Sequence, residues 1–570
     1  MLMKKLLIIL IAMFMLFGCG SKSEDGGTDG SDVASTSEVT IQVPADIMSM
    51  DPQLATDGQS FTAQNLCFAG LLQLDADGNP VPDMAESYTV SEDGCVYTFT
   101  LRDSYWSNGD KVTADDYVYA WKRLVSPELA SEYGWILETA NVVGAGCCWG
   151  PDSGLTVDDL GVKALDEKTL EVTLTQPTGF FTQIVTFPST FPLNQKFYES
   201  VGDQYALKLE NILFCGPYKM TSWDASYGYS FELNDSYYDY ENYKGKYADK
   251  LNFRIVSDTQ SALLDYNAKN IDVVSLSGAQ VKANENVEGF IKKLGSYNFY
   301  LLFNINYLKD GANQATSNIN VRKAIAYGID REDIASALND GSVATYGIIP
   351  NKLAANPETG KDFREDAGDL LSFDQDLAKQ AYADACAELG VDKISLNLMY
   401  SSDQGDPEIV AATRIAAQLE EVGFEVELNA QVKKSRLNVY QHVNTEENGA
   451  TLPEDEWYAD FEVSLTRWGP DYGDPQTYMD LFKSGNTSNN NGGYKSEKYD
   501  ELIAEAEAAG TSSIDRWNDF IEAEKVLIAE DYGVTPVFQN GSAMLINPRM
   551  SGIEFHSASV DVYRHIVVTE

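Results

Sequence analysis

The chain has 570 residues, 44% of them hydrophobic and 11% aromatic, and a formal net charge of −46. A chain of this length and apolar content can bury several hydrophobic cores, so we expect a globular protein of two or three domains. The large negative charge argues against DNA or RNA as a partner, because both are polyanions. After the N-terminal apolar run, no stretch is apolar for long enough to form a transmembrane helix.

The N-terminus has the layout of a secretory signal peptide. Two lysines precede an apolar run from Leu6 to Phe17, which is too short to remain as a membrane-spanning helix. The run leads into the tetrapeptide LFGC, which ends at Cys19 and resembles the bacterial lipobox. In a lipobox the signal, here residues 1–18, is removed and the new N-terminal cysteine carries lipid, which anchors the protein. An ordinary signal peptide with an incidental cysteine is the alternative.

Residues 19–38 follow the signal and are strongly polar. They are nearly all Gly, Ser, Thr, Asp, Glu and Lys, and Val33 and Ala34 are the apolar interruptions. Such a segment cannot bury enough apolar surface to become ordered, so we expect a flexible tether. A lipid on Cys19 would keep the folded part at a membrane, and the tether would let it search for a partner there.

Six further cysteines form no recognisable disulfide framework. Two of them are adjacent, and none belongs to a CxxC pair, which argues against a zinc site. Export would permit disulfides, and buried free thiols are an equally good interpretation. The six are Cys67, Cys95, Cys147, Cys148, Cys215 and Cys386.

Strand patterns and helix patterns alternate along the chain, which predicts a mixed α/β protein. Residues 39–43 and 95–102 alternate apolar and polar side chains as strands do, and residues 160–177 have the pattern of a hairpin. Residues 113–125 begin with a cap-like threonine and an acidic turn and end with basic residues, which indicates an amphipathic helix. Further helices are predicted at 320–338 and 376–390, and a strand, helix, strand unit at 394–431.

No economical catalytic constellation is present. The three histidines, His442, His556 and His565, show no metal-binding spacing, and the chain has no GxSxG and no GxxxxGK[ST] motif. Residues 75–86 place oxygen-bearing side chains at several calcium-loop positions. However, Pro80 stands where that loop requires glycine, so a polar hairpin turn is the better interpretation. We therefore expect a protein that is not an enzyme, with no catalytic residue, no metal site and no cofactor.

Aromatic residues gather at two places. Five tyrosines crowd residues 237–247, and Trp468 and Tyr472 bracket the stretch WGPDY. Such side chains offer a broad contact area to a ligand. For the tyrosines we favour packing at the edge of a core, because partly buried tyrosine is common.

Several motifs, taken in order along the chain, resemble the family 5 extracellular solute-binding proteins, the oligopeptide and dipeptide receptors of ABC importers. The most specific is PDMAESYTVSEDGCVYTFTLRDSYWSNGDKVTADDYVYAWKRLVSP, residues 82–127. The stretches LGVKALDEKTLEVTLTQPTGFF, CGPYKMTSW, NVRKAIAYGIDRE, PDYGDPQTYMDLF and YKSEKYDELI follow. The resemblance covers nearly the whole chain after the tether and is greatest to oligopeptide-binding proteins.

This resemblance implies an α/β, two-lobed fold like the type II periplasmic-binding-protein fold, with an extra domain and three domains in total. Domain I would combine residues 37–61, 190–288 and 538–570. Domain II, the extra domain of the same lobe, would be residues 62–189, and domain III, the second lobe, residues 289–537. Two strand crossovers would form a hinge, and the ligand would be enclosed between domains I and III.

The resemblance also implies a binding site. In related proteins the segment that matches Arg467, Trp468 and Gly469 runs along a bound peptide, and the aspartate that matches Asp471 pairs with the α-amino group of the peptide. An amine and a carboxylate interact strongly in a closed, dry cleft. The alternative for Asp471 is that it only caps the turn PDYGDP; we favour the ligand role. On the opposite lobe, the matching segment is Thr56, Asp57 and Gly58.

One position departs from the family pattern. Well-known oligopeptide receptors have an arginine six residues before the equivalent of Asp471, where it helps to meet peptide C-termini. This chain has Leu465 there, and Arg467 lies nearby but out of register. Residues 444–460 also look like an insertion that could reshape the mouth of the cleft. The preferred peptide length and the recognition of the peptide C-terminus therefore stay open.

We expect a lipid-anchored, monomeric receptor that traps short peptides by closure of its lobes and delivers them to a membrane permease. Separate ATPase subunits of the ABC transporter would supply the energy. The receptor would lie outside the cytoplasm, most plausibly at a Gram-positive-type cell surface, although periplasmic anchoring stays open.

Three alternatives to peptide import stay open at this point. Within the family, the ligand could be a cello-oligosaccharide, haem, nickel or glutathione. The tyrosines suit a sugar, whereas the scarcity of histidine argues against haem and nickel. A peptide or pheromone sensor is a second alternative. A surface hydrolase is the least favoured, because no nucleophile motif is present.

Overall fold

A computed structural model describes residues 37–306, 315–402, 406–440, 461–486, 489–508, 512–556 and 559–569, and Ser37–Glu570 is one compact unit. The expected signal peptide, the lipid site at Cys19 and nearly all of the tether lie outside the described residues, as do His442 and the expected insertion. Glu38, the last residue of the expected tether, is the first residue of strand β1. The chain is fixed at this point, because the backbone amide of Ser37 donates to the Asp249 carboxylate at 2.9 Å.

Eleven strands form one large mixed sheet, which agrees with the predicted α/β class. Its order is β15-β14-β16-β12-β17-β11-β1-β10-β9-β8, and the short β13 pairs with β17. The pair β1 and β10 and the pair β14 and β15 are parallel, whereas β12 is antiparallel to both of its neighbours. The strands are β1 Glu38–Val43, β8 Tyr218–Asp224, β9 Gly228–Leu233, β10 Lys250–Ile255, β11 Val273–Leu276, β12 Phe290–Phe303, β13 Val343–Ala344, β14 Ser395–Ser401, β15 Glu425–Gln431, β16 Val463–Trp468 and β17 Val534–Ile546.

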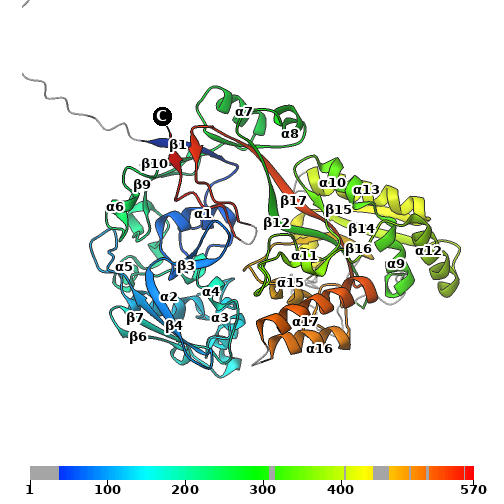
Figure 1. Cartoon of the computed structure of the whole chain (residues 1–570), viewed down its shortest axis with the longest axis horizontal. Helices are drawn as coiled ribbons and strands as arrows, with labels where there is room; N and C mark the ends of the chain where they lie inside the picture. The colour runs from blue at the N-terminus through cyan, green and yellow to red at the C-terminus, as the bar shows by residue number, and fades with distance from the viewer. Residues whose placement is uncertain are drawn as a thin grey trace, which may run out of the picture. The chain divides into compact units, whose positions relative to one another are not determined.

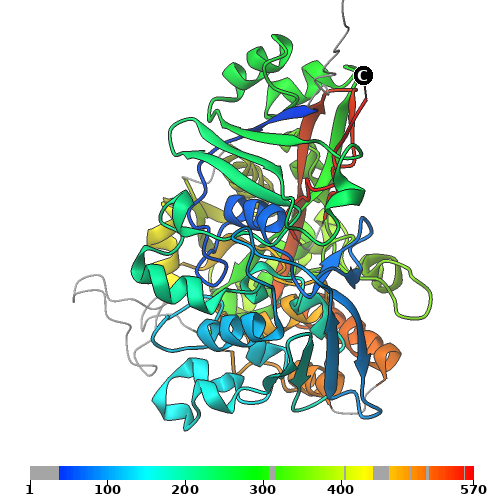
Figure 2. The same ribbon diagram turned by 90° about the vertical axis from the view of Figure 1, so that its left-hand side faces the viewer.

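The two long strands β12 and β17 run side by side from one half of the sheet into the other (Figure 1, Figure 2). The C-terminal end of β17 pairs with β11, and the C-terminal end of β12 pairs with β16. The register between them shifts between Leu294 and Asn298. Close to this shift, a Cβ on Gly541 would lie 2.0 Å from the carbonyl carbon of Gly341, so the crossing requires glycine. These strands match the two expected hinge crossovers.

A second, antiparallel sheet has the order β4-β5-β7-β6 and contains the strand and the hairpin predicted at 95–102 and 160–177. Helix α2 begins at the predicted threonine, Thr113, which forms a capping box with Asp116. The polar turn at residues 75–79 joins strands β2 and β3, as predicted. The elements are β2 Leu72–Leu74, β3 Pro80–Pro82, β4 Ala85–Val90, β5 Val96–Leu101, β6 Val162–Asp166, β7 Thr169–Thr173 and α2 Ala114–Leu124.

The predicted strand, helix, strand unit is β14, α13 and β15, with the two strands parallel. The helix predicted at 320–338 is two helices, because Ile329 leaves the helical conformation and Asp330 caps the next helix. The remaining α-helices are α1 Gly58–Cys67, α3 Ile136–Thr139, α4 Phe181–Ile184, α5 Gln195–Val201, α6 Tyr240–Tyr243, α7 Thr259–Asn267, α8 Ala279–Asn284, α9 Ile319–Gly328, α10 Arg331–Leu338, α11 Phe363–Ala367, α12 Gln375–Leu389, α13 Asp406–Val422, α14 Lys433–Tyr440, α15 Gln476–Met479, α16 Glu497–Glu507 and α17 Ser513–Lys525.

Among the described residues, buried side chains form three large clusters and a smaller one. We call the first the core of lobe 1 and the second and third together the core of lobe 2. The core of lobe 1 joins residues between 39 and 273 with residues between 544 and 566, and Tyr472 packs into it from the turn after β16. The core of lobe 2 is built from residues between 299 and 538. Because the first core runs without a break through the expected domains I and II, these two share one hydrophobic interior. The domain boundaries themselves stay a prediction.

The structure also bears on two questions that the sequence left open, the role of the clustered tyrosines and the oxidation state of the cysteines. Tyr237 and Tyr243 are buried in the core of lobe 1, in agreement with the packing interpretation. All six cysteines of the described residues are free, so the thiol interpretation holds there. In the part of the chain that the structure describes, no helix is both long and apolar enough to cross a membrane.

Candidate binding site

The candidate site begins where strand β16 ends. The strand pairs with β12 up to Trp468, and the chain then turns through Pro470 and Asp471 toward helix α15. Asp474 caps this helix, because its carboxylate accepts the backbone amide of Gln476 at 2.9 Å. Arg516 holds the same carboxylate with two bonds of 2.7 Å. Bidentate pairs of this kind are rigid, so the segment that carries Asp471 is fixed from lobe 2.

Asp471 reaches across to lobe 1. Its carboxylate accepts a hydrogen bond of 3.4 Å from the Tyr133 hydroxyl, and within the described residues this is its one hydrogen-bond partner. The backbone amide of Asp471 donates to the Thr477 hydroxyl at 3.3 Å, so the turn is capped without the carboxylate. Burial raises the pKa of Asp471 to about 7, and the bond from Tyr133 opposes part of this rise.

Aromatic rings hold Tyr133 in place. Its ring centroid lies 4.8 Å from that of Phe187, 5.9 Å from that of Phe61 and 6.0 Å from that of Trp135. A cluster of this kind is apolar and exposes few hydrogen-bonding groups to Asp471. Because this aromatic surface offers few donors, most of the acceptor sites of the Asp471 carboxylate have no hydrogen-bond partner among the described residues.

A small cavity, which we call the cleft cavity, lies between the lobes beside Asp471 and has a volume of about 160 Å³. Lobe 1, the hinge strand β12 and the turn after β16 all contribute to its walls. The contributing residues are Thr56, Gly58, Phe61, Tyr133, Phe187, Pro188, Ser296, Tyr297, Gly469, Pro470, Asp471, Ser559 and Val560.

A larger cavity, the tryptophan cavity, lies on the other side of Asp471 and has a volume of about 470 Å³. Both lobes line it as well. Trp135, Glu138, Thr139 and Trp149 come from lobe 1, and Trp468, Asp471, Tyr472, Thr477, Asp480, Leu481, Asn486 and Asn489 come from the chain of lobe 2. The indole nitrogen of Trp468 is buried and has no hydrogen-bond partner among the described residues, so its N–H is a donor that the described residues leave unused.

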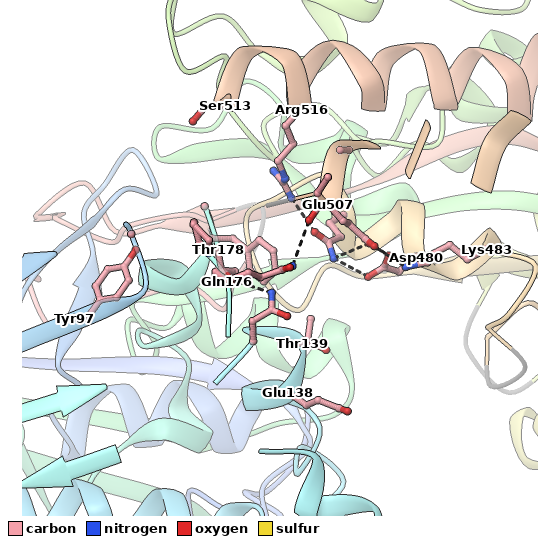
Figure 3. Close-up of a pocket in the computed structure, with 18 residues that line it drawn as sticks. Tyr97, Glu138, Thr139, Gln176, Thr178, Asp480, Lys483, Glu507, Ser513 and Arg516 are labelled. Atoms are coloured by element: carbon pink, nitrogen blue, oxygen red, sulfur yellow. Dashed lines mark hydrogen bonds and ion pairs between the residues drawn. The ribbon is translucent and has the colours of Figure 1, made fainter. Parts of the chain in front are cut away.

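A third cavity, which we call the edge cavity, has a volume of about 490 Å³, similar to that of the tryptophan cavity, and does not touch Asp471. Figure 3 shows Glu138 and Thr139 on one side of it and Asp480, Lys483 and Glu507 on the other. Its polar groups already pair with one another, since Lys483 contacts both carboxylate oxygens of Glu507 at 3.0 Å. Cavity size alone therefore does not locate the site, and we place it at Asp471.

The structure brings together five of the seven predicted ligand-binding residues. Thr56, Gly58, Gly469 and Asp471 line the cleft cavity, and Trp468 and Asp471 line the tryptophan cavity. Thr56 and Gly58 thus face Asp471 from the opposite lobe, as the resemblance implied. Their role in binding stays a prediction.

The other two predicted residues have different partners. The Asp57 carboxylate caps helix α1, because it accepts the backbone amide of Ser60 at 3.0 Å. Arg467 lies over the Tyr297 ring at 4.9 Å and contacts Glu408 at 3.3 Å. Neither residue lines the cleft cavity or the tryptophan cavity, so both side chains have structural roles in this arrangement.

Leu465, at the position where related receptors have an arginine, is fully buried in the core of lobe 2. It lines neither the cleft cavity nor the tryptophan cavity. The replacement of the arginine by Leu465 is therefore a change within the core. A buried leucine offers no charge to the C-terminus of a peptide.

Sequence reasoning identified Thr56 and Gly58 on lobe 1 but missed the aromatic part of that side of the site. Tyr133 lies in an irregular segment between α2 and α3 and is 338 residues from Asp471 along the chain. Trp135, which precedes α3, and Glu138, which lies within α3, line the tryptophan cavity. The one available signal was the density of aromatic and acidic residues in SEYGWILE, which does not distinguish a core from a site.

The polar groups of the site are few. Among the described residues, no group of three or more His, Cys, Asp or Glu side chains is placed to hold a metal ion. The site instead offers the carboxylate of Asp471, apolar walls and the indole N–H of Trp468. A ligand with an amine and a nearby carbonyl would satisfy both polar groups.

Comparison with known proteins gives the same picture over the whole chain. The family model for bacterial extracellular solute-binding proteins, family 5 Middle, matches residues 79–490. A dipeptide-binding protein of Lactococcus lactis subsp. cremoris is 30% identical over 568 residues, which cover 97% of this chain and 96% of that protein. Two solved structures, Listeria monocytogenes OppA bound to peptide and the peptide-binding pheromone receptor PrgZ, are each 29% identical. Each has a TM-score of 0.74, and each match covers 94% of this chain and 100% of the other.

Proposed function

The chain belongs to the bacterial extracellular solute-binding proteins of family 5, and from this premise we propose that it captures short peptides between its lobes and delivers them to the permease of an ABC importer. Members of this family are substrate-binding proteins that act outside the cytoplasm, and they are not enzymes. Relatives that match over nearly the whole chain are named as dipeptide-binding and oligopeptide-binding proteins, and one matching structure is an OppA bound to peptide. These similarities support a peptide as the ligand.

The observation that carries the proposal is the single hydrogen bond of Asp471. A half-buried carboxylate with one long hydrogen bond is costly unless a partner arrives, and the protonated α-amino group of a peptide is such a partner. An amine at Asp471 would contact lobe 2 and lie next to Tyr133 of lobe 1. Contacts to both lobes favour the closed arrangement, which is how a hinged receptor retains its ligand.

The sequence supports the finer parts of the proposal. The LFGC tetrapeptide at Cys19 supports lipid anchoring after removal of residues 1–18, and the polar segment that follows supports a tether to the membrane surface. The family supports delivery to a permease with separate ATPase subunits, and we propose a monomeric receptor. A Cys19→Ala variant tests the anchor, because it should move the protein from the membrane fraction into the soluble fraction of a cell lysate.

Mass spectrometry of small molecules released from freshly purified protein tests the ligand class. The protein would be the chain from residue 20 onward, which contains the whole compact unit Ser37–Glu570. A mixture of peptides would support the proposal and show the length preference. A single sugar, haem, metal or glutathione species would keep the fold and overturn the peptide assignment.

A further inference from the structure

The tryptophan cavity combines three aromatic walls with three carboxyl groups. Trp135 and Trp149 of lobe 1 and Trp468 of lobe 2 line it, and Tyr472 adds a fourth ring. None of the three tryptophans stacks on a lysine or an arginine of the described residues. Trp135 packs partly on Tyr133, whereas Trp149 is largely exposed, so the ring surface that a cation from outside the chain could meet is greatest at Trp149.

The carboxyl groups are Glu138 of lobe 1 and Asp471 and Asp480 of lobe 2. The lining residues of this cavity include no lysine, arginine or histidine. Lys483 is the nearest cation recorded beside them, at 3.4 Å from Asp480, and it also pairs with Glu507. The Asp480 oxygen that Lys483 approaches is buried and has no hydrogen-bond partner among the described residues, and the second oxygen accepts from the Gln476 side chain at 3.2 Å. Glu138 and Asp471 form no ion pair among the described residues, so these two carboxyl groups have no cation of the protein beside them, whereas Asp480 shares Lys483 with Glu507.

Contacts of Tyr472 and Trp149 fix the walls of the tryptophan cavity and the orientation of Glu138. Tyr472 stacks on Phe180 of lobe 1 with centroids 4.6 Å apart, so it fixes the wall between the tryptophan cavity and the core. The indole nitrogen of Trp149 donates to Glu138 at 2.5 Å, which orients this carboxylate and leaves its second oxygen free to accept. Both contacts are formed before any ligand enters.

We propose that the tryptophan cavity selects the side chain of a lysine or an arginine near the N-terminus of the bound peptide. The inference rests on the proposed peptide function. In that function Asp471 pairs with the α-amino group, so Glu138 and Asp480 are the carboxylates left for a cationic side chain from the first residues of the peptide. The apolar stem of the side chain would pack on the tryptophan faces, and its charged end would lie at the two carboxylates.

Other side chains fit this cavity less well. An apolar side chain of the same length would fill the space between the rings but would remove water from Glu138 and Asp480 without offering a donor. An acidic side chain would add a further negative charge next to three carboxyl groups. A basic side chain is the one class that satisfies both the rings and the carboxylates.

The test uses tetraalanine and two matched sets of peptides, in which lysine or norleucine replaces alanine at each of the four positions. Norleucine has the apolar stem of lysine without its charge, so the ratio of the two affinities isolates the charged end. Isothermal titration with the chain from residue 20 onward should show that, at one position near the N-terminus of the peptide, the lysine peptide binds at least tenfold more tightly than the norleucine peptide. The Glu138→Gln and Asp480→Asn variants should each lower this ratio. The Glu92→Gln variant changes an exposed carboxylate in a turn of lobe 1 and should leave it unchanged.

The outcomes separate this inference from the function on which it rests. If tetraalanine binds and lysine is no better than norleucine at every position, the inference is wrong and the peptide function stands. The same conclusion follows if the preference survives in both carboxylate variants. If none of the peptides binds, the peptide function itself is wrong and the inference fails with it.

Discussion

The Tyr133 hydroxyl of lobe 1 donates a 3.4 Å hydrogen bond to the Asp471 carboxylate of lobe 2. This bond joins the two lobes at the point where the cleft cavity and the tryptophan cavity meet. It orients the carboxylate without satisfying it, because a carboxylate has acceptor sites for several donors. The receptor therefore keeps, at the centre of its cleft, a charge that a cationic ligand can balance.

We expect Asp471→Asn to weaken the binding of peptides with a free α-amino group by about 2 kcal/mol or more, roughly thirtyfold in Kd. The amide keeps the shape of the side chain but cannot form an ion pair. Isothermal titration measures the effect, and the matched control is Asp392→Asn, which changes an exposed aspartate of lobe 2. Equal affinity for the wild type and Asp471→Asn would remove this residue from the site.

Peptide affinity should also depend on pH around neutrality. The pKa of Asp471 is raised to about 7, so in the free protein this group loses its proton as pH rises from 6 to 8. The ionised form pairs with an α-amino group, whose own pKa is about 8. Affinity should therefore rise from pH 5.5 to about 7.5 and fall again once the amine deprotonates. Tyr133 faces Asp471 and stays neutral in this range, because burial and the carboxylate raise its pKa. An N-acetylated peptide serves as the control and should bind more weakly, without this rise.

The same residue should lower the stability of the empty protein. Because the folded-state pKa of Asp471 lies above its unfolded value, the penalty for its charge is fully present above pH 7. The penalty disappears as pH falls toward the unfolded value of about 3.9. Asp471→Asn should thus stabilise the unliganded protein by roughly 1–2 kcal/mol at pH 8, and the gain should shrink at pH 5. Denaturant unfolding at both pH values checks this, and a loss of stability at pH 8 would contradict it.

The sequence predicted the class, the regular elements and the lobe 2 side of the site, because these depend on local patterns. Strand β1, helix α2 and the β14, α13, β15 unit follow directly from the spacing of apolar residues and from cap residues such as Thr113. Asp471 was found because the family motif surrounds it along the chain.

The remainder of the site depends on contacts between distant residues. The partnership of Tyr133 with Asp471 arises from the packing of its ring against Phe61 and Phe187, which no local pattern records. For Asp57 the structure shows a local contact, and its role in binding stays a prediction. Its carboxylate satisfies the backbone at the start of α1, a local role that also fits the residue type.

Tyr133→Phe should test the bond between the lobes. The phenylalanine ring can occupy the same aromatic cluster, so we expect the protein to fold normally. Without the hydroxyl donor, the pKa of Asp471 should rise further, and the pH at which peptide binding is half-maximal should move upward. Affinity at pH 7 should fall by about 0.5–1.5 kcal/mol. Titrations at several pH values measure both effects, and an unchanged midpoint would show that the hydroxyl does not influence the carboxylate.

The crossing of the hinge strands should be sensitive to a single methyl group. In Gly541→Ala the new Cβ would lie 2.0 Å from the carbonyl carbon of Gly341, and these backbone atoms cannot move without shifting the strand. We expect a loss of about 1–3 kcal/mol in unfolding free energy, together with a change in peptide affinity, because β17 connects the two lobes. Gly485→Ala is the matched control, since its Cβ would meet no atom within 4 Å. Chemical denaturation and isothermal titration of both variants separate the two effects. Equal stability of Gly541→Ala and the control would show that the crossing can relax around a side chain.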